Sequence, residues 1–162
     1  MKKVLACVFL VIVLFSNFAW SAANQVAPIF LVTPHYASVM MSAADTDRDG
    51  SGDSLYTLFT AGANGSRIDG VQFISSQASA AANSAMVCRI YVTDASGNNP
   101  MLRGEVVLPA VTASNTAVGA VATYSFVNGL ILEAGRVVKV TQSLYAGVQD
   151  KLCASAIGGG DY

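Results

Sequence analysis

The sequence predicts an all-β fold, an antiparallel β-sandwich of the jelly-roll kind. About eight to ten short runs of β-forming residues follow one another at regular spacing, with no helical segments between them. The 162 residues also contain only two glutamates, Glu105 and Glu133, and nine lysines and arginines. Because helices recruit Glu, Lys and Leu on their outer faces, this composition favours strands.

The first two strands are expected at Ile29–Thr33 and Tyr36–Met41, separated by Pro34-His35. Pro28 suits the start of an edge strand, because proline cannot donate a hydrogen bond to a neighbouring strand. The segment Gln25–Thr33 has two possible partners. It can pair within its own domain, or it can add to the exposed edge of a neighbouring copy's sheet.

A central hairpin is expected around Asn64-Gly65, because both residues tolerate the positive φ that a tight hairpin turn requires. Its strands would be Leu55–Thr60 and Arg67–Ile74. The expected inward-facing side chains are those of Leu55, Thr57, Phe59, Ile68, Val71 and Phe73. The step from Ile68 to Val71 breaks strict alternation, which predicts a bulge near Gly70.

Five further stretches complete the predicted sandwich. They are Ala85–Asp94, Met101–Leu108, Ala122–Val127, Arg136–Leu144 and Lys151–Ile157. In the first of them, Met86, Cys88, Ile90 and Val92 are expected to face the core, because alternate residues of a strand share a face. Leu130–Gly135 is expected to form a corner, and Gly158–Tyr162 a tail.

The N-terminus has the three regions of a secretory signal peptide. Met1-Lys2-Lys3 is positively charged, Val4–Phe15 is apolar, and small residues follow up to Ala23. Cleavage after Ala23 and cleavage after Ser21 both fit. The alternative is an uncleaved membrane anchor, but the apolar run is shorter than the roughly 20 residues that a spanning helix needs.

Residues 1–23 are therefore predicted to be a leader, and residues 24–162 a single domain. The mature protein would be secreted, periplasmic or displayed at the cell surface, and would meet the membrane only through the leader before cleavage. Loss of Lys2 and Lys3 changes the formal net charge from −1 to −3. A faintly acidic domain without basic clusters is not expected to bind nucleic acid. The small number of charged residues predicts a surface that is largely covered by copies of the same protein or by partners.

No catalytic motif is visible, so the chain is not expected to be an enzyme. His35 is the only histidine, and no nucleophile elbow, phosphate-binding loop or His/Cys metal spacing is present. The only tryptophan, Trp20, lies in the leader. The tyrosines are scattered one to a strand or loop, which is typical of half-buried packing rather than of a sugar-stacking platform.

Cys88 and Cys153 remain after removal of the leader, in an oxidising compartment. Both fall in expected strands, so a disulfide between them is geometrically feasible. Two buried free thiols would give the same sequence pattern, because free cysteine packs as a small hydrophobic residue.

A calcium loop is the one metal site that the sequence suggests. Asp45, Asp47, Asp49 and Asp53 match positions 1, 3, 5 and 9 of an EF-hand loop, with Gly50 at the turn. Position 12 is Tyr56 instead of a bidentate acid and the flanking sequence is β-like, which excludes an EF-hand. A looser, weak extracellular Ca²⁺ site and a solvated turn capped by its own Asp side chains both remain.

Three segments resemble a family of small β-rich proteins of tailed phages and prophages, regarded as virion structural proteins. They are Phe59–Ile68 (FTAGANGSRI), Leu132–Gly135 (LEAG) and Gly158–Tyr162 (GGGDY). The resemblance implies a non-enzymatic, jelly-roll-like subunit that coats or extends a particle as a homo-oligomer or repeating array. The signal peptide departs from that family and suggests an exported surface component, or a virion-associated protein with another assembly route.

The competing function is a secreted binding module of the lectin or adhesin type, which the predicted calcium loop would suit. The two functions predict different behaviour in solution. A structural subunit forms large particles in solution, whereas a binding module stays small and retains a glycan or another ligand.

Overall fold

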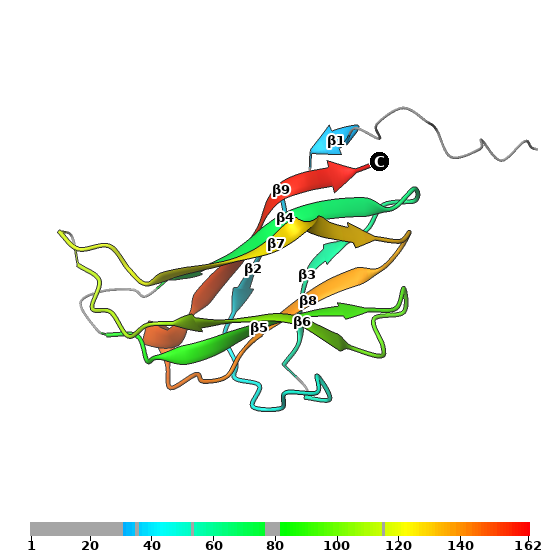
Figure 1. Cartoon of the computed structure of the whole chain (residues 1–162). Coiled ribbons are helices and arrows are strands. Elements are labelled where there is room, and N and C mark those ends of the chain that lie inside the picture. Colours follow the sequence, from blue (N-terminus) through cyan, green and yellow to red (C-terminus); the bar gives the residue numbers. More distant parts are fainter. Residues whose placement is uncertain (1–30, 35, 53, 77–81, 115) are drawn as a thin grey trace, which may run out of the picture.

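The computed structural model describes residues 31–34, 36–52, 54–76, 82–114 and 116–162. They form two antiparallel sheets that pack face to face (Figure 1). Sheet A contains, in spatial order, β1 (Thr33–Pro34) and β2 (Ser38–Met41) on one edge, then β9 (Leu152–Asp161), β4 (Ser66–Ser75) and β7 (Val121–Leu132). Sheet B contains β3 (Tyr56–Thr60), β8 (Val137–Gln142), β5 (Met86–Thr93) and β6 (Met101–Leu108), and a short 3₁₀ turn, Val148–Asp150, precedes β9.

The pairing of the strands is that of a jelly roll. β5 pairs with β6, β4 with β7, β3 with β8 and β2 with β9, as if one long antiparallel hairpin had been rolled up. Neighbouring pairs therefore alternate between the two sheets, so from β2 to β5 and from β6 to β9 consecutive strands lie on opposite sides of the core. The predicted fold class is confirmed.

The core fills the space between the sheets, because alternate side chains of each strand point inward. β4 contributes Ile68, Val71 and Phe73, all fully buried. In β5 the predicted inward row of Met86, Cys88, Ile90 and Val92 is buried as expected. The alternate residues of β5 are largely buried too, which the sequence did not predict.

The predicted central hairpin is wrong in its pairing. β3 pairs with β8, whereas β4 pairs with β7 and β9, so the chain crosses from one sheet to the other between them. The turn itself forms at the expected place: the Gly65 amide donates to the Gly62 carbonyl at 3.1 Å, and Gly65 has φ +87°. A turn dipeptide fixes the local direction of the chain, and long-range packing decides the partner strand.

The inward positions of β3 also differ from those predicted. Leu58 and Phe59 are buried and Thr57 is exposed, because the β3–β8 register shifts between Thr57 and Phe59. A bulge does lie at the predicted place near Gly70: the register of β4 with β7 shifts between Ile68 and Gly70, whereas the register of β4 with β9 is continuous there.

The C-terminal residues form a strand and not the predicted tail. Gly158–Asp161 belong to β9, which lies between β4 and the β1/β2 edge in sheet A. Gly158 and Gly159 have φ of +60° and +97°, and a Cβ on Gly159 would overlap the Arg67 carbonyl. The glycines are therefore required by close approach of neighbouring strands. The predicted corner is shorter than expected, because β7 continues to Leu132 before the turn.

Candidate functional site

The acidic loop between β2 and β3 lies across the outer face of sheet B (Figure 1). The Asp45 amide donates to the Gln142 carbonyl of β8 at 2.8 Å, and Arg89 Nη1 of β5 donates to the Asp45 carbonyl at 3.1 Å. The Tyr91 hydroxyl, also on β5, donates to the Arg48 carbonyl at 3.2 Å. The loop therefore buries the second face of β5.

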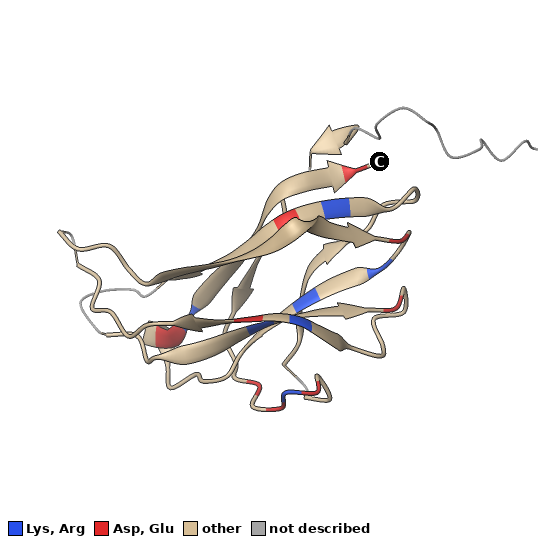
Figure 2. Ribbon diagram, viewed as in Figure 1, with Lys and Arg blue, Asp and Glu red and all other residues tan. Residues whose placement is uncertain are grey.

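Glu105 of β6 joins this loop to the sheet through two arginines, where charges of both signs gather in Figure 2. Its Oε2 accepts from Arg48 Nη2 at 2.6 Å, and its Oε1 accepts from Arg89 Nε at 3.0 Å. The hydrogen bond from Arg48, helped by Arg89, lowers the pKa of Glu105. The same bond raises the pKa of Arg48.

Two of the predicted calcium ligands in this loop, Asp45 and Asp49, accept turn hydrogen bonds through their carboxylates. Asp45 is buried, and its Oδ1 accepts from the Asp47 amide at 3.0 Å. Asp49 Oδ1 accepts from the Ser51 amide at 2.9 Å and hydroxyl at 2.7 Å, which lowers the pKa of Asp49. Asp45 Oδ2 has no hydrogen-bond partner among the described residues.

Across the described ranges, no three His, Cys, Asp or Glu side chains are grouped so as to hold a metal ion. Asp53, the fourth predicted ligand, lies outside the described residues. The four-residue calcium site therefore stays a prediction. Gly50 has φ +78°, as a sharp turn requires, and a Cβ there would lie 2.7 Å from Pro100 Cβ.

The disulfide between Cys88 and Cys153 is not formed, and both residues are free thiols. Cys88 is fully buried on the inner face of sheet B, and burial raises the pKa of its thiol to about 12. Cys153 alternates with the buried Leu152 and Ala154, so it lies on the outer face of sheet A. The two thiols are thus on opposite sides of sheet A.

The outer face of sheet A carries an apolar row that crosses four strands. Val121 of β7 lies opposite Ile74 of β4, Ile74 lies opposite Cys153 of β9, and Cys153 lies opposite Met40 of β2. Val121 and Met40 are 49% and 47% exposed, and the other two are half-buried.

The next two rows of this face are neutral. The adjacent row contains Thr123, Gln72, Ser155 and Ser38, and the one beyond it contains Ser125, Gly70 and Ile157. Gln72 Nε2 lies 3.5 Å from Thr123 Oγ1, so these side chains contact along the face. The apolar row and these two rows define the neutral face of sheet A, which contains no charged residue.

A wide bulge interrupts β7 beyond this face. Ser125 pairs with Gly70 and Leu130 pairs with Ile68, so residues 126–129 of β7 stand opposite Asp69 alone. Bulges of this kind at a sheet edge redirect side chains out of the regular ladder.

The bulge contains a tight turn that exposes a valine. Asn128 and Gly129 have φ of 66° and 75°, the two consecutive positive values of a type I′ turn. Phe126 packs edge-on against Tyr124, with ring centroids 5.1 Å apart. Val127 is 89% exposed. The sequence analysis missed this turn, although the Asn-Gly dipeptide is its standard signal.

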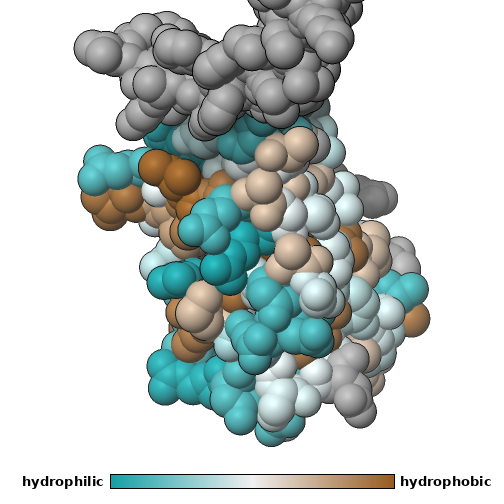
Figure 3. All heavy atoms as spheres, turned by 90° about the vertical axis from the view of Figure 1, so that its right-hand side faces the viewer, coloured by the Kyte–Doolittle hydropathy of each residue, from teal (hydrophilic) through white to brown (hydrophobic). Residues whose placement is uncertain are grey.

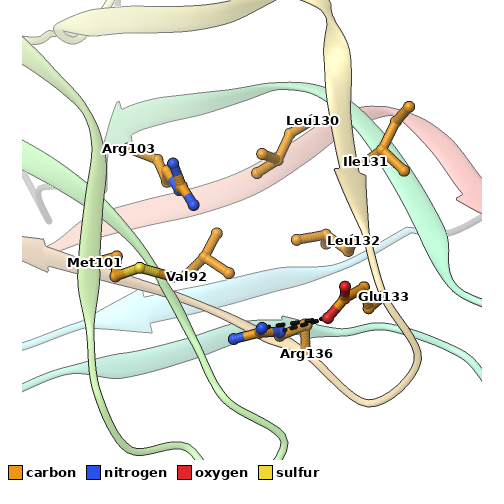
Figure 4. A pocket seen from close by; sticks show the side chains of 8 residues that line it. All are labelled: Val92, Met101, Arg103, Leu130, Ile131, Leu132, Glu133 and Arg136. Carbon is orange, nitrogen blue, oxygen red and sulfur yellow. Dashed lines mark hydrogen bonds and ion pairs between the residues drawn. The ribbon is translucent and has the colours of Figure 1, made fainter.

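A pocket of about 200 Å³ lies between the edge strands β6 and β7 (Figure 4). It is lined by Val92, Met101, Arg103, Leu130, Ile131, Leu132, Glu133 and Arg136. Hydrophobic residues also gather at one side of the end of the sandwich seen in Figure 3, next to hydrophilic ones.

Two arginines give the pocket its polar rim. Arg136 pairs with Glu133 across the β7–β8 turn at 3.2 Å. Arg103 is the extra residue of a β6 bulge, because Leu102 pairs with Tyr91 and Gly104 with Ile90. Its guanidinium makes no hydrogen bond or ion pair with any residue of the described ranges. The pocket therefore has five apolar side chains and three charged ones in its lining, and of the charged ones Arg103 has no partner within the described ranges.

No family model and no curated protein matches the sequence. The chain is similar to a chain in the structure of infectious bursal disease virus Gt strain, at 16% identity and a TM-score of 0.26. The match covers 85% of this chain and 36% of the other, so this chain spans about a third of that chain's length. A likeness of this degree supports no conclusion about function. Within the described residues, no helix is long and apolar enough to cross a bilayer.

Proposed function

We propose that this protein is a non-enzymatic structural subunit, which associates with copies of itself and so builds or coats a larger particle or surface. The observation that carries the proposal is the neutral face of sheet A. An antiparallel sheet with one solvated face usually alternates apolar residues inward with polar ones outward, and about a quarter to a third of a protein's surface is charged. This face has no charge across three rows.

Burial of a face of this composition costs little desolvation free energy and little side-chain entropy. Val121, Ile74 and Met40 gain from removal of their apolar surface from water. Short hydroxyl side chains such as Thr123 lose little rotamer freedom and carry no charge to desolvate, unlike lysine or glutamate. Depletion of charge is also what distinguishes the centres of protein interfaces from the remaining surface.

Export is part of this proposal. Residues 1–23, which lie outside the described residues, are proposed to be removed after Ser21 or Ala23, so that assembly takes place outside the cytoplasm. Mass spectrometry of the protein from its host should find a chain that begins at Ala22 or Asn24. An intact leader from Met1 to Trp20 would contradict export.

Sedimentation of the mature chain over a range of concentrations tests self-association. We expect species heavier than the monomer, and a shift toward monomer in Thr123→Lys and Ser125→Lys, which place charges on the neutral face. The matched control is Thr57→Lys, at an exposed position of β3 in the other sheet. A wild-type chain that remains monomeric at high concentration would refute the proposal.

A further inference from the structure

We propose a second contact between copies, in which Val127 of one copy inserts into the β6–β7 pocket of another. This inference rests on the proposed structural function, since it assumes that copies associate. It uses a surface separate from the neutral face of sheet A, namely the side of the sandwich where β6 and β7 form the sheet edges.

Val127 is held in position before any contact is made. The type I′ turn at Asn128-Gly129 fixes the backbone after it, and Phe126 is anchored on Tyr124 before it. The turn is backed by the Arg67–Asp69 ion pair of 2.8 Å, because a Cβ on Gly129 would lie 3.0 Å from Asp69 Oδ1. A side chain fixed in this way loses little freedom when it is buried in a partner.

The pocket suits an aliphatic side chain. Its interior is formed by Val92, Met101, Leu130 and Leu132, and about 200 Å³ is ample room for the three side-chain carbons of a valine (Figure 4). Met101 is 43% exposed at the mouth, and its flexible thioether can adjust to the shape of the inserted group.

A second copy of the chain is the occupant that the geometry favours. Val127 and Leu130 belong to the same strand, so the projecting residue and the pocket lie on one side of the molecule. A twofold axis through that side would give an isologous contact, in which each copy both inserts Val127 and receives it. Ile131, 69% exposed and part of the pocket wall, would be covered by the same contact.

Each of the two surfaces has charged side chains beside it. Arg103 at the pocket has no partner within its own chain's described residues, and Asp69, whose side chain is 47% exposed, lies against the turn that carries Val127. In an isologous pair, Arg103 of each copy would approach the Arg67–Asp69 pair of the other. Asp69 would then be shared between Arg67 of its own copy and Arg103 of the other, in a charge network at the rim of the interface.

The test compares Val127→Asp with Val118→Asp, a control at a valine that is 85% exposed in the loop before β7. Val127→Asp should lower the mass of the assemblies by at least twofold, because copies joined by this isologous contact separate and only the contact through the neutral face remains. Val118→Asp should sediment as wild type. Since both valines are exposed, the circular dichroism spectra should not change.

Cross-linking identifies the partner surface directly. In a Cys153→Ser background, Val127→Cys mixed with Met101→Cys should form a disulfide between two different chains under mild oxidation, whereas Val118→Cys mixed with Met101→Cys should not. If wild type assembles but Val127→Asp matches it and no cross-link forms, the second contact is refuted and the proposed function stands. If wild type is monomeric at high concentration, both are refuted.

Discussion

The outer faces of the two sheets differ in their charge and in how far the chain covers them. The face of sheet B carries polar and charged side chains, Arg89, Tyr91 and Thr93, yet it is covered by the chain's own loop and these residues are buried. The three rows of the neutral face of sheet A carry no charge, although the Arg67–Asp69 ion pair of β4 lies beside them on the same sheet. Among the described residues, Met40 and Val121 of this face stay about half exposed. The chain thus covers the polar side chains of β5 with its own loop, whereas the neutral face of sheet A stays exposed among the described residues.

The largest effect should come from removal of the tyrosine beneath the loop. Tyr91→Ala deletes a fully buried ring and its hydrogen bond to the Arg48 carbonyl, so we expect a loss of about 4 kcal/mol in the free energy of unfolding. Urea denaturation measures it. Tyr36→Ala, at a fully exposed tyrosine, is the control and should change stability by less than about 0.5 kcal/mol. Equal effects would contradict the covered face.

The next effect concerns the arginine that links the loop to β6. Arg89→Ala leaves Glu105 and the Asp45 carbonyl without a largely buried donor, and should lower the free energy of unfolding by about 3 kcal/mol. Arg48 binds the same carboxylate, but its side chain is 71% exposed. Arg48→Ala should therefore cost less than about 1 kcal/mol in the same denaturation assay. A reversed order would show that the loop, and not the sheet, holds Glu105.

The two cysteines lie on different kinds of face, Cys88 on the inner face of sheet B and Cys153 on the outer face of sheet A. Because the pKa of Cys88 is about 12 in the folded state, the unfolded chain ionises first as pH rises above about 9. Below about pH 9 the thiol of Cys88 is neutral in both states, so its burial makes its full contribution to the free energy of unfolding. Above that pH, this contribution to the free energy of unfolding should fall by about 1.4 kcal/mol per pH unit up to about pH 12.

Denaturation at several alkaline pH values should show this loss of stability with pH in wild type, and the loss due to Cys88 should be missing in Cys88→Ala.

Thiol labelling gives a second measure. Cys153 should react in the native protein, Cys88 only after unfolding, and both in unfolded, unreduced protein. The absence of any reactive thiol after unfolding would indicate a bridge between the two cysteines.

The smallest effect is that of calcium on the covering loop. If the predicted site has a Kd of about 10⁻³ M, a few millimolar Ca²⁺ should stabilise the fold by about 1 kcal/mol. The double variant Asp47→Ala, Asp49→Ala should lose this response in thermal denaturation. An unchanged Tm in wild type would mean that the loop is only a hydrogen-bonded turn.

The sequence predicted what local alternation determines. β5 and β6 lie where expected, since their apolar periodicity depends on neighbouring residues alone. It failed for the partner of β3, because pairing joins residues far apart in the chain. It also missed the last part of β9, because the glycines interpreted as a tail are required by close approach to Arg67. The neutral face could not be predicted either, since it depends on the register of four strands.

The location of β9 also has a consequence for synthesis. This strand occupies a position between β4 and β2 in sheet A, yet it is formed by residues 152–161. Until those residues leave the ribosome, the nascent chain has a gap in the middle of one sheet. We therefore expect sheet A to be completed only after residues 152–161 have been made, with β4 and β2 lacking their shared partner strand until then.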